Sequence, residues 1–216
     1  MHIEFRSRIN RINSNKNKTY LPQEIDLFLN ASMTKFIKDT VSSISPNLGF
    51  EDIQERLDDV RTLIKTDSSN SVEGGTLELK SFDRGKRVDL PGNYNHLVRV
   101  SADTFNNCFN YKKVPCRSYS NEIIDTILVT EFHRSHVKSP VCNLHNTLIK
   151  VYEDRFTVSN IYVTYLTTYP EIVYQVEDCV LPAHTHSDIV DLAVSRVNSV
   201  LNSGNYEKYL NEIKNN

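Results

Sequence analysis

The 216-residue sequence contains no long apolar run. No segment approaches the roughly 18 consecutive apolar residues that a membrane-spanning helix needs. The first residues, MHIEFRSRINRINSN, also lack the apolar stretch of a signal peptide. The four cysteines are scattered, which in a reducing compartment favours free thiols over a disulfide framework: Cys108, Cys116, Cys142 and Cys179. We therefore expect a protein made in a cytoplasm, with no membrane partner.

Recognisable catalytic motifs are also missing. The chain has no G-x-S-x-G elbow, no phosphate-binding glycine loop, no G-x-G-x-x-G and no H-E-x-x-H pair. His133 and His136, in EFHRSHVKSP, have the chemistry of an acid or base, but no nucleophile is paired with them in the sequence. We expect no enzyme activity and no cofactor.

The composition is that of a folded protein whose charges are unevenly distributed. Hydrophobic residues make up 39% and charged residues 24%, with a net charge of -2, which fits one or two globular folding units. Basic residues gather near the N-terminus: Arg6, Arg8, Arg11, Lys16 and Lys18. Acidic residues gather further on: Glu51, Asp52, Glu55, Asp58 and Asp59. Such runs are usually solvated faces, and they are also candidates for interfaces or DNA contacts.

Apolar spacing predicts two helices in the first part of the chain. Residues 20–44 place Ile25, Phe28, Leu29 and Ile37 close to one helical face, with Pro22 in the first turn. Residues 49–66 carry a second stripe that runs from Phe50 through Ile64. A connector with the sequence SPNLG would join the two as a helical hairpin. Residues 67–75 are small and polar, and predict a loop.

Short β-branched and aromatic runs dominate the middle of the chain. The segments predicted as strands are 76–82, 96–105, 125–132, 147–154 and 160–169. The stretch NLHNTLIKVYEDRFTVSNIYVTYL predicts a hairpin that turns near Asp154 and Arg155. We expect a mostly antiparallel sheet.

The stretch LPAHTHSDIVDLAVSRV, residues 181–197, has two interpretations. The favoured one is a helix start, in which Pro182 restricts the entering chain, Thr185 caps the first amides and Asp188 favours the helix dipole. The alternative is a zinc site built from side chains that zinc accepts: Cys142, His145, Cys179, His184 and His186. Only the first two of these have a spacing typical of a zinc site.

Together these segments predict an α+β fold. Residues 1–68 would form an N-terminal arm and helical hairpin, 69–181 a β-rich insertion, and 182–216 C-terminal helices that pack on the N-terminal ones. A short amphipathic tail, YEKYLNEIKNN, ends the sequence. The loop 67–75 and this tail are candidates for ordering on docking.

Three segments in order resemble structural proteins of tailed bacteriophages: EIDLFLNASMTKFI, VDLPGNYNHLVRV and VLPAHTHSDIVDLAVSRV. Together with YLTTYPEIV, they are similar in particular to the ring, or head-to-tail connector, proteins of crAss-like phages, from about Glu24 to Val197. The resemblance implies a virion protein of the neck or tail, with a helical core and an inserted β region. It also implies a dodecameric ring below the portal that extends the channel for genome ejection, with the portal protein and other neck or tail ring proteins as partners. It supplies no catalytic residues.

A ring of identical subunits uses heterologous contacts, in which one face of each copy complements a different face of the next. We expect the acidic second helix and the basic N-terminal arm to be two such faces. The arm can also contact genomic DNA without reading its sequence. Alternative functions are a soluble nucleic-acid-binding or interaction module, or a small metal-dependent enzyme.

Overall fold

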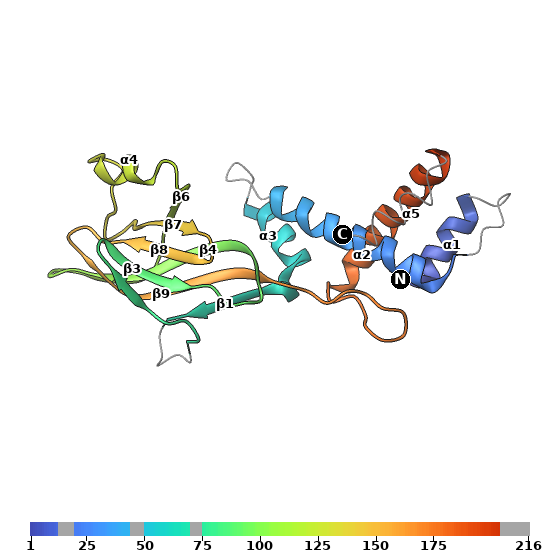
Figure 1. The fold of residues 1–216 in the computed structure, drawn as a ribbon, viewed down its shortest axis with the longest axis horizontal. Helices are drawn as coiled ribbons and strands as arrows, with labels where there is room; N and C mark the ends of the chain where they lie inside the picture. Colours follow the sequence, from blue (N-terminus) through green and yellow to red (C-terminus); the bar gives the residue numbers. More distant parts are fainter. Residues whose placement is uncertain (13–19, 44–49, 70–74, 204–216) are drawn as a thin grey trace. The chain divides into compact units, whose positions relative to one another are not determined.

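The computed structural model describes residues 1–12, 20–43, 50–69 and 75–203. They divide into two compact units. The helical unit contains the described residues up to Leu63 and from Tyr169 onward, and the β unit spans Ile64–Thr168. The structure has the expected α+β class, with helices towards both ends and mainly antiparallel sheets (Figure 1).

The helical unit is built on α2, Pro22–Ser43, and α5, His186–Ser203, which pack against each other. Both helices were predicted from the sequence. Their apolar stripes form the core of the unit, with these side chains buried: Ile25, Phe28, Leu29, Met33 and Ile37 on α2, and Ile189, Val190, Ala193, Val194 and Val197 on α5. No helix in the described part of the chain is long and apolar enough to cross a membrane.

The N-terminal segment differs from the expected arm because it forms a helix, α1, His2–Ile12. Phe5 and Ile9 are buried, and α1 packs against α5 and α2. A spacing of four residues places both side chains on one face of a helix. The expectation of an arm rested on the basic residues of this segment and not on the spacing of Phe5 and Ile9, whose burial fixes the segment to the unit.

The second predicted helix is shorter than expected. The helix α3 covers Phe50–Asp59, a 3-10 turn η1 covers Arg61–Leu63, and the strand β1 begins at Ile64. The stripe from Val60 to Ile64 suggested continued helix. Instead, antiparallel pairing with a distant strand satisfies the backbone from Ile64 onward, and this pairing overrides local spacing.

The β unit consists of two sheets that share one core. The first has the order β1-β9-β4-β5 and is fully antiparallel, with β1 at Ile64–Ser68, β9 at Thr157–Thr167, β4 at Tyr94–Phe105 and β5 at Asn110–Pro115. The second has the order β2-β3-β8-β7-β6, with β2 at Lys80–Phe82, β3 at Gly85–Asp89, β8 at Leu148–Tyr152, β7 at Val141–His145 and β6 at Arg117–Tyr119. Within it only β6 and β7 run parallel. Both sheets contribute to the shared core: Val88, Cys142, Ile149 and Val151 from one, and Val100, Ala102, Ile161, Val163 and Tyr165 from the other.

Two sequence predictions in the β unit are wrong. The segment 125–132, expected as a strand, contains the helix α4, Ile124–Val129. The hairpin expected around Asp154 and Arg155 is a corner at which the chain changes sheets, because β8 pairs with β7 and β3 while β9 pairs with β1 and β4. The turn itself is real, since Arg155 has a φ of 54°. The true hairpin is β7–β8, with Asn146 at a φ of 56° between them.

The boundaries of the units also differ from the expected ones at 68/69 and 181/182. The change of unit falls at 63/64 and at 168/169. Residues after Thr168 leave the sheet and attach to α2. The side chain of Asn30 forms two hydrogen bonds with the backbone of Ile172, donating to its carbonyl at 3.0 Å and accepting from its amide at 2.7 Å. Tyr169 bonds the hydroxyl of Thr34 at 3.2 Å.

The two hydrogen bonds between Asn30 and the backbone of Ile172 lead to a prediction about stability. Replacing Asn30 with alanine removes both hydrogen bonds to the backbone of Ile172, and we expect the free energy of unfolding to fall by about 1–3 kcal/mol. The measurement is urea denaturation followed by the helical circular dichroism signal. Lys38→Ala, at an exposed position of the same helix, is the matched control. Equal stability of the two variants would show that the hydrogen bonds of Asn30 do not stabilise the fold.

Candidate functional site

The five zinc candidates are divided between the two units, and most of them are engaged with other groups. Cys142 and His145 lie on β7 of the β unit, one buried and one exposed, and the other three candidates belong to the helical unit. His184 Nε2 lies 3.0 Å from Asp59 Oδ1, and His186 Nε2 donates to the carbonyl of Leu181 at 3.0 Å. Among the residues that the structure describes, no three His, Cys, Asp or Glu side chains are grouped as a metal site would require.

Cys179 and Cys142 have protein partners of their own. Cys179 Sγ lies 3.9 Å from Met33 Sδ in the helical unit. Cys142 lies 3.4 Å from the hydroxyl of Ser118, and its thiol also hydrogen bonds with Cys116 inside the core of the β unit. The hydrogen bond from Cys116 lowers the pKa of Cys142, and that of Cys116 is raised by the same contact.

The opening of the C-terminal helix has the predicted position but not the predicted cap. A 3-10 turn η3, Ala183–Thr185, precedes α5, and Asp188 lies in the first turn of α5. The Thr185 hydroxyl is buried and donates to the carbonyl of Pro182 at 2.9 Å. It therefore closes the turn that leads into the helix, and the role of Thr185 as an acceptor for the first amides is wrong.

Of the described basic candidates in the N-terminal segment, Arg8 is bonded within the helical unit, and Arg6 and Arg11 are exposed. The guanidinium of Arg8 donates to Glu4 Oε1 at 2.5 Å, to the Ser187 hydroxyl at 2.8 Å and to the carboxylate of Asp191. The hydrogen bond to Asp191 is the main cause that raises the pKa of Arg8. Arg8 thus links α1 to the first turns of α5, which leaves Arg6 and Arg11 as exposed side chains of this helix. Lys16 and Lys18 lie outside the described residues.

The acidic candidates are carried by α3. Glu55 and Asp58 are exposed, whereas Asp59 is partly buried and pairs with His184. Glu51 and Asp52 lie within the bounds of α3, but their side chains are outside the described part. Four of the charged candidates are therefore exposed in the described part of the chain. They are the basic Arg6 and Arg11 on α1, and the acidic Glu55 and Asp58 on α3. Most of the predicted loop at 67–75 and the whole tail at 206–216 also lie outside the described residues.

The structure reveals two apolar surfaces that the sequence analysis did not single out. The first is the α4 segment, residues 120–133, which lies outside the two sheets of the β unit (Figure 1). On this segment Phe132 is 90% exposed, Val129 is 83% exposed and Ile123 is partly exposed. Large apolar side chains in this state commonly mark contact sites when they are grouped.

The α4 segment is held in place from beneath. Ile124 is buried against Val141 and Tyr152. The side chain of Asn121 donates to the carbonyl of Leu144 at 3.1 Å. At the far end, Arg117 Nη2 donates to three carbonyls of the following loop, those of His133, Arg134 and Ser139, at 3.1, 2.8 and 3.3 Å. The exposed apolar groups therefore sit on a fixed backbone.

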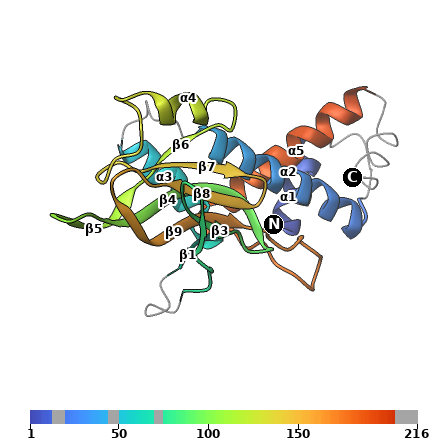
Figure 2. The same ribbon diagram turned by 60° about the vertical axis from the view of Figure 1, so that its left-hand side comes forward.

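The second surface is the tip of the β4–β5 hairpin, which projects from the rest of the β unit (Figure 2). Asn106 Oδ1 accepts hydrogen bonds from the amides of Cys108 at 3.1 Å and Phe109 at 2.8 Å, which fixes the turn. Phe109 is 58% exposed, and its ring lies 5.9 Å from that of Tyr111. Lys138 Nζ lies over the Tyr111 ring, 5.6 Å from its centre.

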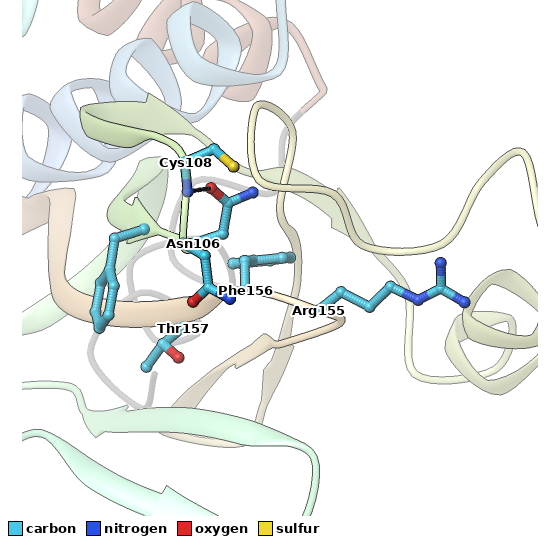
Figure 3. Close-up of a pocket in the computed structure, with 7 residues that line it drawn as sticks. Asn106, Cys108, Arg155, Phe156 and Thr157 are labelled. Atoms are coloured by element: carbon cyan, nitrogen blue, oxygen red, sulfur yellow. Dashed lines mark hydrogen bonds between the residues drawn. The ribbon is translucent and has the colours of Figure 1, made fainter.

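A hollow of about 500 Å³ lies beside this tip (Figure 3). Its lining comes from the turn of the hairpin and from the corner at which the chain changes sheets: Phe105, Asn106, Asn107, Cys108, Arg155, Phe156 and Thr157. Arg155 extends away from Phe156 and Thr157, so the hollow combines aromatic groups with polar edges (Figure 3). It suits a side chain from another molecule better than a substrate held for chemistry, since its lining contains no acid–base or nucleophile–base pair.

A sequence signal existed for the hairpin tip but not for the α4 segment. Phe109 stands inside NNCFN, where turn-forming residues surround an aromatic one. In DTILVTEF, the β-branched run suggested a buried strand, and only tertiary structure shows that Val129 and Phe132 face outward. The two histidines considered for catalysis, His133 and His136, are exposed.

No protein-family model matches the chain, and no curated protein sequence is similar enough to be counted as a homologue.

The Asn106 turn makes a prediction about the hairpin tip. In Asn106→Ala, the amides of Cys108 and Phe109 lose their acceptor, and we expect their hydrogen exchange to accelerate roughly five- to ten-fold. NMR-detected exchange measures this directly. Asn107→Ala removes an adjacent exposed amide side chain and serves as the control. The same acceleration in both variants would show that the turn does not depend on Asn106.

Proposed function

We propose that this chain is a virion structural protein, the subunit of a head-to-tail connector ring in the neck of a crAss-like tailed phage. The observation that carries the proposal is the presence of outward-facing apolar side chains on two rigidly held segments of one unit, Val129 and Phe132 on one and Phe105 and Phe109 on the other. Grouped apolar side chains on ordered segments suit protein–protein contact. The resemblance of four sequence segments to ring proteins supplies the specific role.

The proposed partners are further copies of the chain, the portal protein and other neck or tail ring proteins. The ring would sit below the portal and continue the channel through which the genome leaves. Non-specific contact with DNA remains a smaller part of the proposal, because Arg8 is engaged with α5 and only Arg6 and Arg11 extend from the described N-terminal helix. A channel through which DNA slides requires weak contact of this kind.

The test is to mix the purified chain with the portal protein of the same genome and to image the mixture by electron microscopy. We expect added ring density on the outer mouth of the portal, with a symmetry that can be counted, twelve-fold by resemblance. Density elsewhere in the neck or tail, after addition of another ring protein, would move the position of the ring. Bare portals under every combination of neck proteins would contradict the connector role.

The charge complementarity expected from the sequence gives a second prediction. We expect Arg6→Glu together with Arg11→Glu to reduce the fraction of decorated portals, more strongly at low salt, because an attraction to Glu55 and Asp58 of a neighbouring copy becomes a repulsion. Arg8 is left unchanged because it stabilises the fold. Lys35→Glu with Lys38→Glu makes the same charge change on exposed positions of α2. If this control loses as much decoration, net charge rather than the α1 surface is responsible.

A further inference from the structure

We infer that the α4 segment of one copy binds the tip of the β4–β5 hairpin of the next copy, with Phe132 entering the hollow beside that tip. The inference rests on the proposed ring function and names the contact by which neighbouring subunits associate. Both halves of the contact lie on the β unit of the same chain. Each copy therefore offers one half to each neighbour, as a heterologous assembly requires.

The charges of the two surfaces are opposite. The α4 segment carries Glu122, Asp125 and Glu131, all exposed, and no Lys or Arg. Asp125 lies 3.4 Å from Arg84 of the same copy, so Glu122 and Glu131 are the acidic groups on which the attraction depends. Residues 105–113 carry Lys112 and Lys113 and no acidic residue, and Lys138 lies alongside at Tyr111. A surface with one sign of charge around apolar groups selects a surface with the other sign, and this arrangement orients two copies as they approach. Two α4 segments would instead repel each other.

The shapes also complement each other. Phe132 is 90% exposed and offers a complete aromatic ring. The lining of the hollow of about 500 Å³ includes the aromatic side chains of Phe105 and Phe156. Aromatic rings in contact gain about 0.5–1.5 kcal/mol beyond the burial of their area. Because Asn106 fixes the turn and Arg117 fixes the α4 loop, little conformational entropy is lost when the two meet.

The magnitude of the contact suits copies that are held together in an assembly better than two free molecules. Full burial of Phe132 and Val129 contributes about 1.5–3 kcal/mol each, while association costs about 4–15 kcal/mol in lost translation and rotation. One such contact is too weak to hold two free molecules at low concentration. Copies held side by side on a platform such as the portal would make it, because the effective concentration is then in the millimolar range.

Chemical cross-linking of the full-length chain tests this contact without requiring tight binding. Cys108 is exposed on the rim of the hollow. A background of Cys116→Ser with Cys179→Ser removes the two partly buried thiols and leaves Cys108 as the exposed one. In it, Val129→Cys places a second accessible thiol next to Phe132, and a bismaleimide joins thiols of molecules in contact. We expect a ladder of dimers, trimers and larger species on a denaturing gel, since each copy carries both reactive positions. Ile3→Cys, at a position 87% exposed on α1, is matched to Val129→Cys at 83% and should give at least about ten-fold less product.

Two further variants decide which surfaces meet. Adding Cys108→Ser to Val129→Cys should abolish the ladder, and adding Phe132→Asp should reduce it about ten-fold, equivalent to about 1.4 kcal/mol. Equal yields from Ile3→Cys and Val129→Cys would overturn the inference. Dimers that persist without Cys108 would also overturn it, because α4 segments would then be meeting each other. If portals are decorated but no ladder forms, the connector role stands and this contact is contradicted. If a ladder forms but portals stay bare, the contact stands and the connector role is contradicted.

Discussion

The antiparallel pairing of β1 with β9 is the constraint on which the rest of the structure depends. The chain enters the β unit at Ile64 and leaves it just after Thr167, and Ile64 is the partner of Leu166 in that pairing. The ends of the β unit are therefore held at adjacent positions, and the helical unit receives two chain segments that arrive together. The side chain of Tyr165 reinforces the pairing by donating to Asp67 at 2.7 Å. Burial, with a further contribution from this bond, raises the pKa of Tyr165 to about 12.

The strand β9 also connects this pair to the projecting β4–β5 hairpin, because it pairs with β1 on one side and with β4 on the other. It pairs along most of its length with β4, and a buried carboxylate, Asp103, sits where the register of β4 shifts. Asp103 accepts hydrogen bonds from the amide of Lys113 at 2.8 Å, the hydroxyl of Tyr162 at 2.9 Å and the side chain of Asn160 at 3.0 Å. A buried charge is stable only when its acceptor positions are used. These hydrogen bonds fix the base of the β4–β5 hairpin to β9. The position of the exposed tip therefore depends on the core of the β unit.

The sequence anticipated those elements whose cause is local. The stripes of α2 and α5 identify their buried faces, and Pro182 marks the start of the last helical segment. Elements whose cause lies elsewhere in the chain were missed. Ile64 extends a helical stripe, yet Leu166, about a hundred residues away, makes it a strand. The corner at Arg155 has the residues of a hairpin turn, and only the competition between two sheets decides that β8 and β9 separate. The same limit applies to the candidate surfaces, because Phe132 differs from a core phenylalanine in nothing that its sequence neighbours reveal.

The proposed ring assembly requires a weak contact between copies. A chain that carries both halves of a heterologous interface forms open filaments in solution if the contact is strong and its geometry does not close. Acidic groups beside Phe132 and basic groups beside Phe109 keep each exposed apolar patch small and solvated, and in the inferred contact they would also make one patch prefer the other. The stability of the whole assembly would then come from the number of such contacts and from a platform that brings the copies together. Two modest surfaces on one rigid β unit suit a subunit that assembles only where a platform holds many copies side by side.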